Sequence, residues 1–108
     1  MTDKIVVLVT CGNREEAGKL AKSLVEKRLA ACVNLLPGIS SWYWWENTVT
    51  EYHEILLMIK SSRTKYAELE KEVLRLHSYA VPEVIALQIV DGSANYLGWI
   101  EESLKEVV

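Results

Sequence analysis

The side chains best suited to chemistry in this sequence are a thiol, an imidazole and a carboxylate, carried by Cys11, His77 and Glu83. A thiolate and an imidazole favour copper or zinc, and a carboxylate can add an oxygen ligand. The three residues show none of the close spacings, such as CxxC or HxxxH, that mark a dedicated metal site. We therefore expect no required cofactor, and we treat these residues as a candidate site for Cu(II) or another divalent ion.

Two of these residues also suit roles that involve no metal. His77 follows an expected helix, and the C-terminal end of a helix stabilises a partly positive imidazole without any ligand. Cys11 lies just before another expected helix, whose N-terminus can lower the pKa of a thiol and activate a nucleophile. No Cys-His-Asn arrangement accompanies Cys11, so the expectation is a protein that is not an enzyme. A small thiol enzyme using Cys11 is the alternative.

A run of aromatic residues at 42–45 contains three of the four tryptophans of the chain. In a strand, Trp42 and Trp44 point to one face, and Tyr43 and Trp45 point to the other. Such rings can stack on bases, line a ligand cleft or anchor a contact between subunits.

The composition of the 108-residue chain narrows its class. Half of the residues are hydrophobic and a quarter are charged, which is typical of a single globular domain, here residues 1–108. The net charge of −3 argues against a nucleic-acid partner. We see no secretory signal and no apolar run of about 20 residues, so we expect no membrane. Cys11 and Cys32 then indicate free thiols and a cytoplasmic location.

The elements that must position these residues follow from hydrophobic periodicity. The β-branched run at 4–10 predicts a central strand. Asn13, with Glu16 three residues later, predicts the start of a first helix. Alternation over 31–46 and 49–60 predicts two overlong strands.

Local signals complete the chain. Pro37-Gly38 predicts a bulge within the first long strand, and the sequence at 46–48 predicts a tight turn between the two. Ser61 or Ser62 is expected to cap a second helix, residues 84–90 predict a fourth strand, and Ser93 is expected to cap a last helix.

The order of these elements is β-α-β-β-α-β followed by a helix. With right-handed crossovers this order gives a ferredoxin-like α+β sandwich, in which two helices cover one face of a four-stranded antiparallel sheet with a long hairpin. The strands are apolar on both faces, so the uncovered face predicts self-association. Closed cyclic symmetry would bury every such face and stop growth.

Five motifs, spread over nearly the whole chain in the expected order, resemble the CutA family. They are Ala31-Cys32-Val33-Asn34-Leu35, Tyr43-x-Trp45-Glu46, Glu54, His77-x-Tyr79-x-Val81-Pro82-Glu83 and Tyr96-Leu97-x-Trp99-Ile100. CutA-like proteins are divalent-cation tolerance proteins with a ferredoxin-like fold that form homotrimers similar in architecture to PII signalling proteins. The resemblance implies that Tyr43 and Trp45 anchor the trimer and that Glu54 makes a hydrogen bond between subunits.

The resemblance also shows departures. Copper-binding relatives carry a cysteine at the end of the first strand, where this chain has Val9, and Cys11 lies two residues away. Ser78 replaces the usual proline, and Asn47 replaces the usual glycine. His77 is thus the copper ligand that the resemblance carries over directly.

These observations predict a non-enzymatic homotrimer that binds divalent ions, copper among them, or a small PII-like ligand in the clefts between its subunits. Trp42 and Trp44 would line such a cleft. A structural or signalling trimer for a protein partner remains the other alternative.

Overall fold

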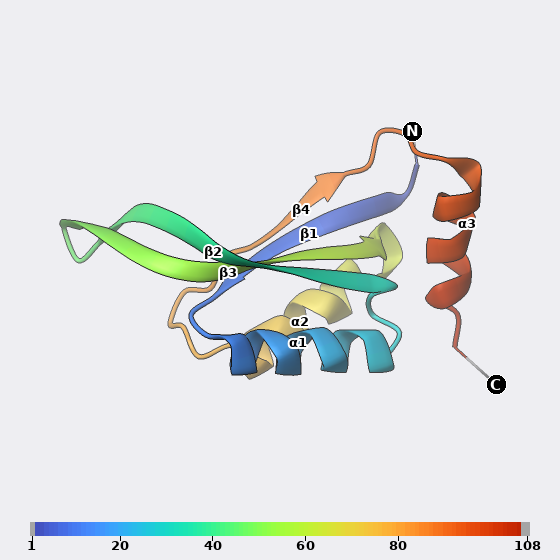
Figure 1. Ribbon diagram of the computed structural model, residues 1–108. Helices are drawn as coiled ribbons and strands as arrows, with labels where there is room; N and C mark the ends of the chain where they lie inside the picture. The colour runs from blue at the N-terminus through green and yellow to red at the C-terminus, as the bar shows by residue number, and fades with distance from the viewer. Residues whose placement is uncertain (1, 107–108) are drawn as a thin grey trace.

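The structure is a computed structural model that describes residues 2–106. Its elements follow in the order β1 (Lys4–Cys11), α1 (Arg14–Glu26), β2 (Cys32–Trp45), β3 (Thr48–Ser62), the 3-10 turn η1 (Arg63–Lys65), α2 (Tyr66–Leu76), β4 (Val84–Gln88) and α3 (Ala94–Ser103). Figure 1 shows α1 and α2 together beneath the sheet.

The four strands form one antiparallel sheet in the order β2-β3-β1-β4. Each α-helix crossover skips one strand position, as right-handed packing of two β-α-β halves requires. The α+β sandwich predicted from the sequence is therefore confirmed.

The core lies between the sheet and the two helices, and alternate residues of the central strands fill it. Its largest fully buried side chains are Val7, Val9, Cys11, Leu20, Leu24, Leu57, Ile59, Leu69 and Val73. The opposite face of the sheet carries Leu36, Ile85 and Leu87, which are exposed. The prediction that the sheet is apolar on both faces is confirmed.

The first helix begins as expected, but its capping box is only half formed. Asn13 Oδ1 accepts from the Glu16 N–H at 2.9 Å. The Glu16 carboxylate does not return this contact and instead accepts from the backbone N–H and the hydroxyl of Ser78. Glu16 thereby ties the start of α1 to the segment after α2.

The expectation that Ser61 or Ser62 caps the second helix is wrong. Ser61 is buried, and its hydroxyl donates to the Leu29 carbonyl at 2.6 Å. Ser62 instead precedes η1 and shares a hydrogen bond with the Thr64 hydroxyl. The intervening 3-10 turn moves the start of α2 to Tyr66, away from either serine.

The fourth strand is shorter than the predicted 84–90. Its last ladder partner is Gln88, opposite Ile5, and the Ile89 N–H makes one more bond to the Lys4 carbonyl. Beyond that point the Ile89 carbonyl accepts from the Thr2 hydroxyl at 2.8 Å, so a side chain takes the place of a ladder partner where β1 begins.

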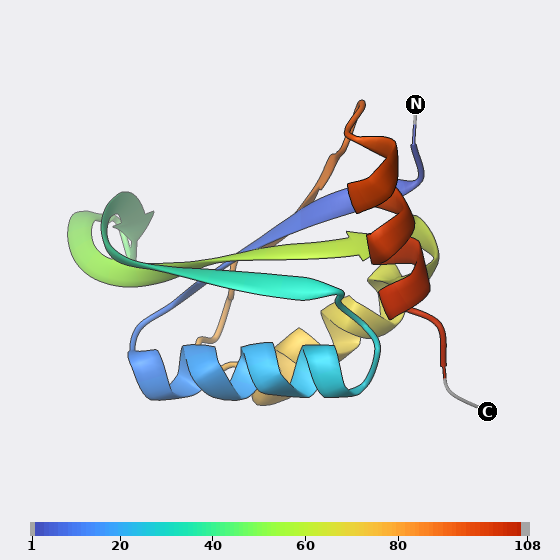
Figure 2. The ribbon, with the colours of Figure 1, turned by 45° about the vertical axis from the view of Figure 1, so that its right-hand side comes forward.

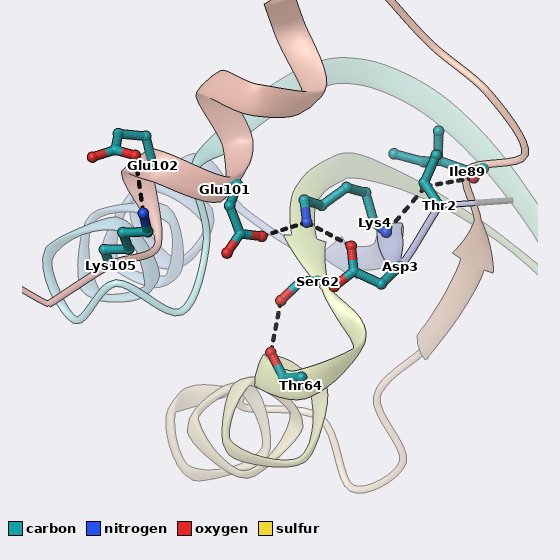
Figure 3. A network of polar contacts seen from close by, with 9 residues as sticks. All are labelled: Thr2, Asp3, Lys4, Ser62, Thr64, Ile89, Glu101, Glu102 and Lys105. Carbon is teal, nitrogen blue, oxygen red and sulfur yellow. Dashed lines mark hydrogen bonds and ion pairs between the residues drawn. The ribbon is translucent and has the colours of Figure 1, made fainter. Parts of the chain in front are cut away.

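Helix α3, whose cap Ser93 is confirmed, stands at the end of the sheet away from the hairpin tip (Figure 2). A buried ammonium helps to hold it there: Lys4 Nζ donates to Asp3 Oδ1 and to Glu101 Oε1 of α3, each at 2.6 Å (Figure 3). Burial alone would lower the pKa of Lys4, but these hydrogen bonds outweigh it and the pKa is raised.

The hairpin of β2 and β3 projects beyond the core, and the chain reaches 46 Å along its longest axis. At its tip Glu46 and Asn47 have φ values of 49° and 62°, as in the type I′ turn that matches strand twist. The predicted tight turn is confirmed. Gly38 has φ 78°, and here two residues of β2 oppose one of β3, so the predicted bulge is confirmed as well.

Candidate functional site

A cavity of about 560 Å³ opens at the root of the hairpin. The end of β1, both hairpin strands and the connection 77–83 between α2 and β4 contribute to its walls. Half of the lining residues are aromatic, namely Trp42, Tyr43, Trp44, Trp45, Tyr52 and Tyr79. The lining also includes two carboxylates, those of Glu54 and Glu83.

The bulge in β2 determines which aromatic rings lie on the same face of the sheet as the carboxylate of Glu54. Before it, Leu36 pairs with Leu56; after it, Ile39 pairs with Glu54. The extra residue reverses the alternation of β2, so that Ile39, Tyr43 and Trp45 lie on the same face as Leu36. This is the face of the sheet that the helices leave open.

Glu54 is the most enclosed charge of the cavity, with 6% of its surface exposed. Its Oε2 accepts a hydrogen bond of 2.7 Å from the Tyr79 hydroxyl. The pKa of Tyr79 is raised, chiefly by burial and then by this bond and by the charge of Glu54. Burial, and then the charge of Glu54, also raise the pKa of Glu83.

Gly12, which follows β1, approaches two of the lining phenols closely. A Cβ added to Gly12 would lie 3.0 Å from the Tyr79 hydroxyl, which is tight, and 3.5 Å from the Tyr52 ring, which is an ordinary contact. Glycine therefore lets the chain pass Tyr79 without displacing its hydroxyl.

Behind this cavity the fold brings Cys11 and His77 together, with 3.8 Å between Cys11 Sγ and His77 Nε2. His77 is the C-cap of α2, and its ring is buried. Nε2 lies 2.7 Å from the Thr10 carbonyl and must donate to it, whereas Nδ1 accepts from the Tyr79 N–H at 3.1 Å. The arrangement assigns a neutral imidazole that is protonated on Nε2.

The surroundings of Cys11 oppose its use as a nucleophile. The side chain is fully buried in the core. Burial, followed by the charges of Glu16 and Glu54, raises the pKa of its thiol to about 12. A reactive cysteine needs the opposite, a lowered pKa and access to solvent.

Glu83 does not join Cys11 and His77. Within residues 2–106, no three histidine, cysteine, aspartate or glutamate side chains cluster closely enough to hold a metal ion. Of the proposed ligand set the fold assembles one pair, and it places Glu83 in the wall of the cavity instead.

The four aromatic residues at 42–45 differ in exposure. Trp42 and Trp44 are 67% and 73% exposed, whereas Tyr43 and Trp45 are 38% and 47% exposed. The side chains of all four are more exposed than those of a packed core.

Sequence reasoning assigned no role to two further aromatic residues of the lining, Tyr52 and Tyr79. Tyr52 could have been found, because it lies two residues before Glu54 in a strand and so shares its face. Tyr79 stands in the motif at 77–83 that resembles CutA, but periodicity could not place it, since it lies in an irregular connection whose path is set by tertiary contacts.

No helix in the described part of the chain has both the length and the apolar character needed to cross a bilayer.

Comparison with known proteins places this geometry in context. The family model described as "CutA1 divalent ion tolerance protein" matches residues 5–103. The "Divalent-cation tolerance protein CutA" of Thermus thermophilus is 46% identical over 98 residues, which are 91% of this chain and 95% of the relative. "Protein CutA, chloroplastic" of Arabidopsis thaliana is 50% identical over 101 residues, which are 94% of this chain but 56% of the plant protein.

The fold is also shared with a solved CutA1 structure. The solved structure of CutA1 from Oryza sativa superposes with a TM-score of 0.92 at 46% identity, covering 96% of this chain and 95% of that one. Sequence and structure agree over nearly the full length. The chain therefore belongs to the CutA1 family of divalent ion tolerance proteins.

Proposed function

We propose that this protein is a non-enzymatic homotrimer that supports divalent-cation tolerance by binding divalent ions, with Cu(II) among the candidates. The observation that carries the assembly is the bare apolar face of the sheet, continuous with the projecting hairpin. Leu36, Ile85 and Leu87 are exposed on this face together with Tyr43 and Trp45. Contact with neighbouring copies would remove from water the hydrophobic surface that a single chain leaves exposed.

The ion would bind where Cys11 and His77 meet. Two donors from different elements lie within reach of one ion, and both suit copper or zinc. Binding requires His77 Nε2 to give up its bond to the Thr10 carbonyl and the Cys11 thiol to lose its proton. Affinity should therefore rise with pH. Glu83 is the candidate oxygen ligand and would join through a shift of the connection 77–83.

Catalysis by Cys11 is not part of this function, because its thiol is buried and its pKa is raised. The protein would act in the cytoplasm, which the free thiols of Cys11 and Cys32 support. A second candidate, binding of a small PII-like ligand in clefts between subunits, is favoured by the cavity at the hairpin root.

Two measurements test the proposal. Size-exclusion chromatography with light scattering should give three times the mass of one chain, and a stable monomer would refute the assembly. Calorimetry with Cu(II) and with Zn(II), on protein without an affinity tag, should show binding that is lost in His77→Ala. His53→Ala is the matched control, because His53 is the other histidine of the chain and is exposed on β3. Equal loss in both variants, or in neither, removes His77 from the site.

A further inference from the structure

We infer that the cavity at the hairpin root binds an organic cation, a small molecule carrying an ammonium group. This deepens the small-ligand candidate above and rests on it in one respect, that the cavity remains open to solutes in the assembled protein. The inference comes from the charge and the shape of the lining.

The charge of the lining is negative and is not compensated there. Glu54 and Glu83 are its ionisable carboxylates, and the lining contains no lysine, arginine or histidine. Neither carboxylate forms an ion pair within residues 2–106, although the same part of the chain pairs Glu72, Glu101 and other acids with lysine or arginine. Among the described residues, the Tyr79 hydroxyl is the one hydrogen-bond donor to Glu54, at 2.7 Å. A cation in the cavity would supply the missing charge.

The rings of the lining select the kind of cation. Six aromatic side chains from β2, β3 and the connection 77–83 surround the carboxylates. The faces of tryptophan and tyrosine attract ammonium groups through their quadrupoles, and aromatic cages are used to recognise quaternary ammonium compounds. Trp42 and Trp44 are the most exposed rings of the lining, so a solute can reach them.

Other ligand classes fit less well. A bare metal ion needs several close donors, and the described residues include no cluster of three potential ligands. An anion would meet two carboxylates and no basic side chain. The volume of about 560 Å³ suits a molecule of several heavy atoms rather than a single ion.

A basic side chain from a neighbouring subunit is the main rival occupant. It would satisfy the same two carboxylates and the same rings, and would leave no space for a solute. The test must therefore use the protein in its native oligomeric state.

Choline is the probe for the first experiment, and 3,3-dimethylbutan-1-ol, which has a similar shape but no charge, is the comparison. Titration of the native protein by calorimetry should show choline binding at least tenfold more tightly than the neutral alcohol. Acetate, the anionic probe, should show no binding. Equal affinity for choline and the alcohol would overturn the inference. So would a failure of choline to bind, which would point to a cavity filled by the neighbouring subunit.

Matched variants locate the site. Glu83→Gln should weaken choline binding at least fivefold, whereas Glu46→Gln, at the hairpin tip and outside the cavity, should leave it unchanged. Trp44→Ala should weaken it similarly, whereas Trp99→Ala, an exposed ring outside the lining, should not. Equal effects in a variant and its control would overturn the assignment.

Light scattering on each variant separates this inference from the proposed function. A trimer that binds Cu(II) but not choline leaves the proposed function intact and removes the organic-cation site. A monomer that still binds choline refutes the proposed trimer and leaves the organic-cation site intact.

Discussion

The hydroxyl of Tyr79 donates to the carboxylate of Glu54 across 2.7 Å, joining the connection after α2 to the middle of β3. Glu54 is buried and forms no ion pair within residues 2–106, so this phenol is its one side-chain hydrogen-bond donor. The bond links two parts of the cavity lining, and its loss should lower stability.

Tyr79→Phe should lower the free energy of unfolding by about 1.5–3 kcal/mol, because it leaves a buried carboxylate without a donor. Urea unfolding at pH 7 measures this. Tyr66→Phe is the control: the Tyr66 hydroxyl donates to Glu70 at 2.9 Å, one turn along α2, where both side chains reach solvent. It should cost less than about 1 kcal/mol. Equal losses would mean that Glu54 finds another donor once Tyr79 is removed.

The two thiols should differ sharply in reactivity. Burial and the charges of Glu16 and Glu54 raise the pKa of Cys11 to about 12, so almost no thiolate forms at pH 8. Cys32 is only partly buried. A disulfide reagent at pH 8 should therefore modify one thiol in the native protein and two after unfolding. Cys32→Ser should abolish the native reaction, and rapid modification of that variant would contradict the raised pKa.

The raised pKa of Cys11 also affects the stability of the protein at alkaline pH. The folded-state pKa of Cys11 lies above its ordinary value of 9.0, so the folded protein holds this proton more tightly than the unfolded chain. Its contribution to stability is fully present below pH 9 and is lost as the pH rises towards 12. Unfolding of wild type and Cys11→Ala should therefore differ most below pH 9.

A buried carboxylate on α2 should govern part of the acid stability. Glu72 accepts hydrogen bonds from Arg75, Ser23 and Lys27, which lower its pKa far below the ordinary 4.5. Because the pKa is lowered on folding, this contribution is present above pH 4.5 and declines as the pH falls below it.

Glu72→Gln should reduce the free energy of unfolding by about 1 kcal/mol at pH 7, a modest figure because Lys27 and Arg75 are largely exposed. The difference from wild type should shrink below pH 4. Glu68→Gln, an exposed position on the same helix, should change little at either pH. A difference that is undiminished at pH 3 would show that the side-chain shape, not its charge, stabilises α2.

The bulge at Gly38 should depend on its glycine. With φ at 78°, an alanine there is strained by about 1 kcal/mol, although a Cβ would meet nothing within 4 Å. Gly38→Ala should destabilise the protein by that amount in urea unfolding. Gly18→Ala is the matched control, since Gly18 lies exposed in α1 with open space around it, and it should stabilise by roughly 0.5–1 kcal/mol.

The sequence predicts most of the architecture because local signals agree with the fold. The β-branched run of β1, the Asn13 cap and the alternation of β2 and β3 each select one kind of element. The predictions fail where tertiary contacts override a local signal. The sequence predicts Ser61 as a helix cap, but its hydroxyl donates to the Leu29 carbonyl instead. The sequence also predicts a longer β4, but β4 stops where its neighbour β1 begins.

The site is less predictable than the fold. Sequence patterns place the rings at 42–45 correctly in a strand, but the face they occupy depends on the bulge at Gly38. The contact of Cys11 with His77 joins positions 66 residues apart. The hydrogen-bond roles that engage both nitrogens of His77 come from backbone groups of Thr10 and Tyr79, which no residue type specifies.

The two faces of the hairpin should contribute unequally to the proposed trimer. Trp45 lies on the open face of the sheet beside Tyr43, continuous with exposed Ile85 and Leu87, whereas Trp42 points to the other side. Large aromatic residues at the centre of an interface carry most of its binding energy, often about 2 kcal/mol or more each. Trp45→Ala should therefore raise the dissociation constant of the trimer more than tenfold, while Trp42→Ala changes it less than threefold. Light scattering over a dilution series measures both dissociation constants. An equal rise in the two variants would mean that neighbouring copies contact both faces of the hairpin.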